Sequence, residues 1–181
     1  SDNEVLSAIK LLNDVGSKKG SNGMPELLPG LNFVFGLRGE TKKTFDINYE
    51  FLKKLLDQNL LVRRINLRQV IPIPGTKMEE IGNKLVNKHK SDFKKFKRRV
   101  KEEIEQPMLK KMLPVGNIVR EVYTEKLDGK LAFGRQLGSY PLLIGMPGFQ
   151  ELNKFIDVKI VDYGLAITQL LLSLIHISEP T

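Results

Sequence analysis

Hydrophobic residues in the first half of the chain follow two spacings, one typical of strands and one typical of helices. Short apolar runs, "LNFVFG" (31–36) and "LVRRINLRQVI" (61–71), predict two buried strands. Between them, residues 42–58 repeat apolar side chains at helical spacing, and Thr41 is a suitable N-cap. A strand–helix–strand order favours two parallel strands joined by a crossover helix. The expected buried stripe of this helix is Phe45, Tyr49, Leu52 and Leu56.

Two more helices are predicted on either side of this unit. Residues 3–15 form the first, and a Gly/Pro-rich loop, "GSKKGSNGMPELLPG" (16–30), follows it. A long helix is expected over 79–105, and Pro107 then breaks or restarts it. The expected buried stripes are Val5, Ala8, Ile9, Leu12 and Val15 in the first helix, and Val86, His89, Phe93, Phe96, Val100 and Ile104 in the second.

The last third of the chain changes to strand patterns. "NIVREVYTEKLDGKLAFGRQ" (117–136) predicts two strands around the Asp128-Gly129 turn, a strong hairpin signal. "YPLLIGM" (140–146) and "FIDVKIVDY" (155–163) supply two more strands. We therefore predict an α/β protein that ends in a small antiparallel β-barrel.

Alternation along the two parallel strands predicts which side chains share a face. Apolar residues on one face should meet the helices, so the opposite face turns Asn32, Gly36, Asn66 and Arg68 inward. Buried polar groups need partners, which could be a ligand, water or one another. An internal Arg–acid network and a solvated rim remain alternative readings. The apolar face contains Leu31, Phe33, Phe35, Ile65, Leu67 and Ile71, with Gln69 among them, whereas Val34 and Arg64 belong to the polar face.

Charge is concentrated in one segment of the chain. The net charge is +8, and residues 84–111 hold eleven Lys or Arg against four acids. Such a stripe is either a nucleic-acid or acidic-partner surface or the solvated face of a long helix. The nucleic-acid candidates are Lys94, Lys95, Lys97, Arg98 and Arg99.

Composition excludes several classes of chemistry. The chain has 181 residues, 41% hydrophobic, and no Cys, so neither disulfides nor thiolate metal sites can form within it. His89 lies on an apolar stripe and is expected to be a packed histidine rather than a ligand. The residues form no Ser–His–Asp triad or carboxylate pair. The absence of a signal-peptide pattern and of a long apolar run predicts a cytoplasmic protein that does not enter a membrane.

Both ends of the chain suggest a piece of a longer protein. "LSLIHISEPT" (172–181) matches the translation of a transposon-derived sequencing adapter, so we expect these residues to pack on nothing. The first residues, "SDNEVLSAI", lack an initiator Met.

The loop "GLRGETKKTF" (36–45) looks like a phosphate loop but lacks the Walker A spacing, and no KH strand pattern surrounds it. In context, "LNFVFGLRGETKKTF" (31–45) followed by "RRINLRQVIPIPGTKM" (63–78) resembles the back half of a radical S-adenosylmethionine (SAM) enzyme barrel, close to the methylthiotransferases and an archaeal group of radical SAM proteins. Residues 84–113 and 114–169, including "GRQLGSYPLLIGMP", are similar to the linker helix and TRAM-type barrel of that branch.

This resemblance implies that residues 1–83 belong to the barrel of an enzyme that uses SAM and a [4Fe–4S] cluster to make a 5′-deoxyadenosyl radical. The cluster cysteines would lie in a missing N-terminal half, so this chain would be inactive alone. A second reading is an RNA-binding module, and a third is a structural fragment that binds a partner. The resemblance places near SAM or substrate Asn32, Val34, Gly36, Asn66, Arg68, Gln69, Val70 and Ile71.

Overall fold

The structure is a computed structural model of the chain. It describes residues 2–137, 141–148, 151–163 and 169–174, and it gives only the backbone for 169–174. The chain divides into two compact units. Unit 1 contains residues 1–14 and 28–108, and unit 2 contains residues 15–27 and 109–181. Neither unit is therefore one continuous stretch of sequence. No helix within the described ranges is long and apolar enough to cross a membrane.

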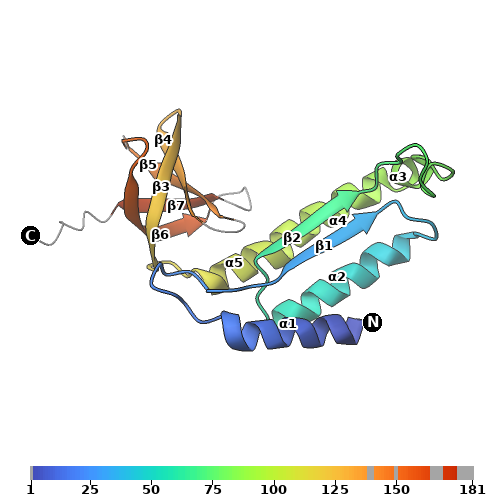
Figure 1. Cartoon of the computed structure of the whole chain (residues 1–181), viewed down its shortest axis with the longest axis horizontal. Helices are drawn as coiled ribbons and strands as arrows, with labels where there is room; N and C mark the ends of the chain where they lie inside the picture. The colour runs from blue at the N-terminus through green and yellow to red at the C-terminus, as the bar shows by residue number, and fades with distance from the viewer. Residues whose placement is uncertain (1, 138–140, 149–150, 164–168, 175–181) are drawn as a thin grey trace, which may run out of the picture. The chain divides into compact units, whose positions relative to one another are not determined.

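Unit 1 is built on two parallel strands, β1 (Gly30–Phe35) and β2 (Arg64–Gln69), which helix α2 (Lys42–Asp57) connects (Figure 1). The register places Leu31 beside Ile65 and Phe33 beside Leu67. The predicted parallel pair and its crossover helix are thus confirmed. Over the described residues this sheet has two strands, so the structure shows a small parallel sheet rather than half of a (β/α) barrel.

The helices of unit 1 cover one face of this sheet. Phe35 and Ile65 are fully buried with apolar residues of α1 (Asp2–Gly16), α2 and α4 (Lys90–Val100), and Leu31, Phe33 and Leu67 pack against the same cluster. Phe35 is central, because its ring stacks on Phe45 with 5.0 Å between centroids. The predicted apolar face of the sheet is therefore confirmed for Leu31, Phe33, Phe35, Ile65 and Leu67. It is wrong for Ile71, which is 79% exposed.

The predicted stripe of α1 is only partly correct. Leu6, Ile9 and Asn13 are buried, whereas Val5 and Ala8 are exposed, as is Val15. The helix carries apolar side chains on two sides, and spacing alone does not say which side meets the sheet. Asn13 is buried because it bridges to the chain after α2: its Nδ2 donates to Leu61 O at 2.9 Å, and its Oδ1 accepts from Leu61 N at 2.7 Å.

The long basic helix is interrupted. Residues 79–83 are turns, so the predicted start at residue 79 is wrong, and the helical segments are α3 (Lys84–Lys88), α4, the π-helix η1 (Lys101–Glu105) and α5 (Gln106–Met112). Pro107 lacks an N–H and cannot complete the α-helical hydrogen-bond pattern, which accounts for the wider turn before it. The predicted stripe is confirmed for Phe96, Val100 and Ile104, all buried.

Unit 2 contains β3 (Ile118–Asp128), β4 (Leu131–Gln136), β5 (Leu143–Pro147), β6 (Phe155–Tyr163) and β7 (Gln169–Leu174) (Figure 1). β3 to β6 are the four predicted strands, and they form an antiparallel sheet in the order β5–β4–β3–β6. β7 pairs with β6 antiparallel and with β5 parallel, so the pairing runs in a ring.

β7 overturns part of one expectation. Residues 172–174, expected to pack on nothing, pair with β6, with Leu172 opposite Ile160. The backbone of any strand-competent segment can supply ladder hydrogen bonds, whatever the origin of its sequence. Residues 175–181 lie outside the described residues.

Candidate functional site

The face of the β1–β2 sheet that points away from the helices is polar and open. Asn32 lies opposite Asn66, and Asn66 Nδ2 donates to Asn32 Oδ1 at 2.8 Å. Val34 lies opposite Arg68, and both are exposed. Mutual pairing, one of the alternatives from the sequence, therefore holds for the two asparagines. It leaves the Asn32 amide N–H₂, the Asn66 carbonyl oxygen and the Arg68 guanidinium available to a ligand.

The loop after β1 holds its own carboxylate rather than a phosphate. Gly36 N donates to Glu40 Oε2 at 2.7 Å, and Glu40 is buried. Glu40 N donates to Leu37 O at 3.1 Å, which closes the turn. A carboxylate that already occupies the loop amide opposes a second anion there by charge. Thr41 then begins α2, its N–H donating to Thr44 Oγ1 at 3.1 Å.

Gly36 is required by its own surroundings. Its φ is +93°, in the region that favours glycine. A Cβ there would lie 2.5 Å from Val86 Cγ2 and 2.9 Å from Val70 Cγ1. The space that a side chain would need at this position is therefore filled by valines of α3 and of the chain after β2.

The residues after β2 differ in exposure. Gln69 lies opposite Phe35, and Val70 N donates to Phe35 O at 2.8 Å, which extends the parallel ladder. Ile71 is 79% exposed. The Val70 N–H is thus already used, so only Ile71 presents a large free surface among these three positions.

The five basic candidates on α4 do not form one equivalent set. Lys94, Lys95, Lys97 and Arg98 are exposed. Arg99 is exposed as well, but it is held over the Tyr49 ring, with 3.4 Å from Cζ to the centroid, and its Nε lies 3.3 Å from Glu103 Oε2.

Tyr49 OH also donates to Glu103 Oε2 at 2.5 Å, and this hydrogen bond is the main reason the pKa of Glu103 is lowered. The Tyr49–Arg99–Glu103 contacts fasten α2 to α4 and η1. Arg99 is therefore less available than the other four to an external partner.

Glu105 is a titratable residue that the sequence did not single out. It is half-buried at the end of η1, where its carboxylate accepts a hydrogen bond from the Ile65 backbone. Burial raises its pKa to about 7, against the opposing attraction of Lys101, Lys97 and Arg64. No periodicity identifies such a group, because its burial depends on β2 lying beside η1.

His89 is packed, as expected. It is 5% exposed beside Phe45, and its Nδ1 lies 3.1 Å from Asp92 Oδ2. Across the described ranges no three His, Cys, Asp or Glu side chains gather as a metal-ligand group.

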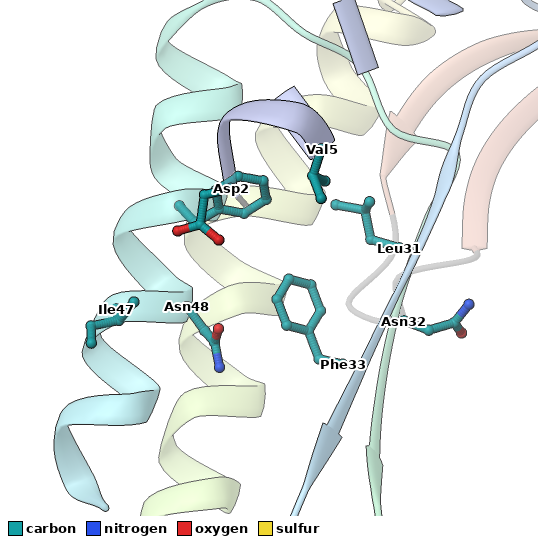
Figure 2. A pocket seen from close by; sticks show the side chains of 8 residues that line it. Asp2, Val5, Leu31, Asn32, Phe33, Ile47 and Asn48 are labelled. Carbon is teal, nitrogen blue, oxygen red and sulfur yellow. The ribbon is translucent and has the colours of Figure 1, made fainter. Parts of the chain in front are cut away.

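A pocket of about 210 Å³ opens between α1, β1 and α2 (Figure 2). Leu31 and Phe33 point into it from the strand, and Asp2 and Asn48 stand at its rim. Its lining is mainly apolar and it contains no basic side chain, so an anionic ligand finds no counter-charge there. The lining residues are Asp2, Val5, Leu31, Asn32, Phe33, Ile47, Asn48 and Phe51.

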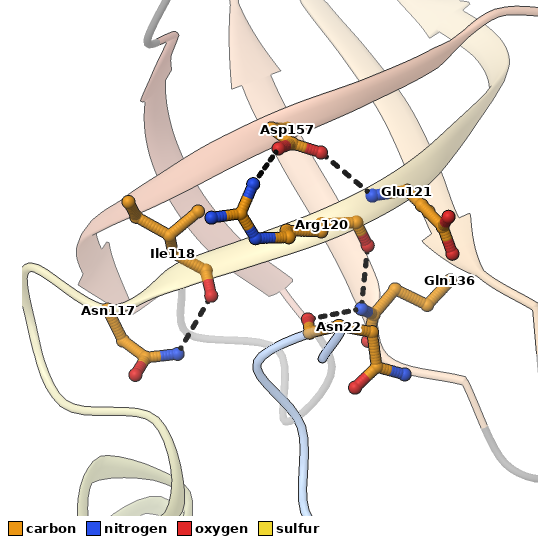
Figure 3. A network of polar contacts seen from close by, with 7 residues as sticks. All are labelled: Asn22, Asn117, Ile118, Arg120, Glu121, Gln136 and Asp157. Atoms are coloured by element: carbon orange, nitrogen blue, oxygen red, sulfur yellow. Dashed lines mark hydrogen bonds and ion pairs between the residues drawn. The ribbon is translucent and has the colours of Figure 1, made fainter. Parts of the chain in front are cut away.

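In unit 2 a polar network ties the segment 15–27 to β3 and β4 (Figure 3). Asn22 O accepts from Arg120 N at 3.0 Å and from Gln136 Nε2 at 3.0 Å. The buried Gln136 side chain donates to Arg120 O as well, at 2.8 Å. These bonds are internal, so the network is structural.

A bulge in β3 belongs to the same network. Glu121 has a φ of +56°, and its N–H donates to Asp157 Oδ1 at 3.1 Å, while Arg120 Nη1 lies 2.9 Å from Asp157 Oδ2. Asp157 on β6 thereby holds the strained residue in place.

The fold and the open polar face define an α/β protein with a parallel β–α–β unit and a separate β-rich unit. No protein-family profile matches the chain. It is 48% identical over 164 residues to an uncharacterized protein of Archaeoglobus fulgidus and 48% identical over 163 residues to one of Methanocaldococcus jannaschii. These matches cover 91% and 89% of this chain but only 31% and 30% of the relatives, so the chain spans about a third of their length.

Proposed function

We propose that this chain is part of a radical SAM enzyme and contributes the adenosyl side of the SAM site. The observation that carries the proposal is the open polar row on the parallel sheet: Asn32, Asn66 and Arg68 share one face, directly before the loop that starts at Gly36. The adenine, ribose and carboxylate of SAM carry hydrogen-bond donors and acceptors that asparagine amides and an arginine guanidinium can bind. Bound SAM would supply the radical chemistry, and these side chains would orient it.

The residues present do not fit the iron–sulfur cluster. Such clusters are held by cysteine thiolates, and the chain has none. The proposal therefore assigns the cluster ligands to another part of a longer polypeptide and gives this chain no catalytic activity of its own.

The proposal is tested in a full-length relative, such as the Archaeoglobus fulgidus protein. We expect it to form 5′-deoxyadenosine from SAM after anaerobic reconstitution. In a relative that has an arginine at the position of Arg68, replacing it by alanine should slow this reaction while the protein stays folded, because a guanidinium contact to a carboxylate or phosphate is lost. A full-length relative that neither binds SAM nor cleaves it would refute the proposal.

A second candidate function is nucleic-acid binding, which the exposed basic residues of α4 favour. The side chains of Lys94, Lys95 and Arg98 have no hydrogen-bond or ion-pair partner among the described residues. Positively charged side chains that make no contact within the protein are available to bind the phosphates of a nucleic acid. Replacing all three by glutamine should weaken RNA binding and reduce the slope of log affinity against log salt by about 2, because each contact to a single strand releases roughly 0.7 counterions. An unchanged slope would mean that these basic residues are only the solvated face of a helix.

A further inference from the structure

The outer surface of unit 2 carries a row of three side chains across neighbouring strands. Tyr123 on β3 lies opposite Arg135 on β4 and opposite Phe155 on β6. Directly opposite residues of antiparallel strands present their side chains on the same face. A guanidinium and two aromatic rings are therefore presented side by side.

The geometry of the row leaves ring surface open. The Tyr123 and Phe155 rings lie 5.2 Å apart between centroids, inclined by 51°. Tyr123 OH donates to Asn153 Oδ1 at 2.9 Å, which fixes its ring. Phe155 is nevertheless 56% exposed. A cross-strand pair that served only the stability of the sheet would gain more by being buried.

One basic side chain, Arg135, lies beside the rings. Arg135 Nη1 lies 3.2 Å from Glu125 Oε2, and the Arg135 side chain remains 43% exposed. Lys154 precedes Phe155, and its Nζ is 3.9 Å from Glu151 Oε2, at the limit of an ion pair. Each of these two cations has an acidic neighbour, so the open ring faces, rather than net charge, are the main feature of the row.

We infer that Tyr123 and Phe155 form a base-stacking platform for single-stranded nucleic acid, with Arg135 next to the phosphates. Base faces stack on exposed aromatic rings whatever the base, and basic side chains beside the rings guide the backbone. This inference rests on the second proposed function and assigns the base contacts to unit 2 rather than to α4.

The test measures binding of a fluorescein-labelled oligouridylate of about twelve nucleotides by this chain over a series of salt concentrations. Phe155→Leu keeps an apolar side chain but removes the ring, and we expect binding between about five- and hundred-fold weaker, the range for loss of one stacked base. The salt slope should not change, because no phosphate contact is lost. Phe155→Tyr keeps a ring and should bind within about twofold of the unaltered chain.

Further arms separate the alternatives. An oligothymidylate should bind through the same platform, and a preference for one sugar would identify RNA or DNA as the ligand. Duplex RNA should compete poorly, because its bases are already stacked. Since Phe155→Leu could disturb folding, the unaltered chain is also crosslinked to an oligonucleotide containing 5-iodouridine, and the crosslinked peptides should contain Tyr123 or Phe155.

Three results would overturn the inference. Oligouridylate binding that Phe155→Leu leaves unchanged, with crosslinks only outside β3 and β6, would refute the platform. If the triple glutamine variant of α4 alone loses affinity, nucleic-acid binding stands and the platform fails. If the unaltered chain binds no oligonucleotide, both fail together.

Discussion

Glu105 should make the stability of unit 1 depend on pH between about 4.5 and 7. Burial raises its pKa from 4.5 to about 7. Below pH 4.5 the carboxyl is protonated in both folded and unfolded chains. Between the two values the folded chain binds the proton more tightly, so the free energy of unfolding falls as pH rises, and above about 7 the loss is complete.

The size of this effect follows from the two pKa values. A pKa rise from 4.5 to about 7 corresponds to roughly 3 kcal/mol at 1.36 kcal/mol per pKa unit. Glu105→Gln has nearly the same shape, accepts the Ile65 hydrogen bond through its amide oxygen, and does not titrate. The variant should match the unaltered chain near pH 4.5 and exceed it by up to about 3 kcal/mol at pH 8.

Urea unfolding followed by circular dichroism at several pH values between 4.5 and 8 measures this difference. Glu102→Gln, on the exposed side of η1, removes one carboxylate without touching β2 and should keep the pH dependence. If Glu105→Gln is less stable than the unaltered chain at pH 8, the attraction of Lys101 and Lys97 outweighs the cost of burial and the reasoning is wrong.

Three further substitutions test internal contacts by thermal unfolding, where about 1 kcal/mol corresponds to roughly 2–4 °C for a chain of this size. Gly23→Ala should lower stability by about 2 kcal/mol or more, since φ is +80° and a Cβ would lie 2.1 Å from Ile118 O; an unchanged midpoint would contradict this packing. Asn13→Ala should cost about 1–3 kcal/mol by leaving both backbone groups of Leu61 unpaired, and amide exchange at Leu61 should quicken. Thr124→Val keeps the shape but removes the buried hydroxyl, so a loss of about 1–3 kcal/mol is expected, and a neutral result would show that the hydroxyl's three hydrogen bonds contribute little.

Local pattern predicted the elements of this fold well. The parallel pair, the crossover helix and four strands of unit 2 all appear, because alternation and helical spacing record which side of each element is buried. The same spacing was only partly right for α1: Ile9 is buried as predicted, but apolar side chains lie on two sides, and only the tertiary partner selects Leu6 over Val5 and Ala8.

Contacts between distant segments were not predictable in this way. The segment 15–27 looks like an ordinary loop in sequence, yet Asn22 accepts hydrogen bonds from β3 and β4. The burial of Glu105 and the pairing of β7 likewise depend on segments far away in the chain. Neither periodicity nor composition carries such information, because both describe a residue relative to its sequence neighbours.

Some polar residues of unit 1 already make hydrogen bonds or ion pairs within the protein, and others do not. Glu40 lies in a loop that could hold a ligand, but its carboxylate already accepts a hydrogen bond from the Gly36 N–H. The need for glycine at position 36 follows from its positive φ and from the two valines beside it. Arg68 is different, since no hydrogen bond or ion pair engages its side chain within the described part of the chain, and it lies on a sheet face that no helix covers. Parallel strands are normally buried on both faces. The uncovered face, rather than the glycine-containing loop, is therefore the part of unit 1 where polar side chains remain free to bind the ligand that we propose.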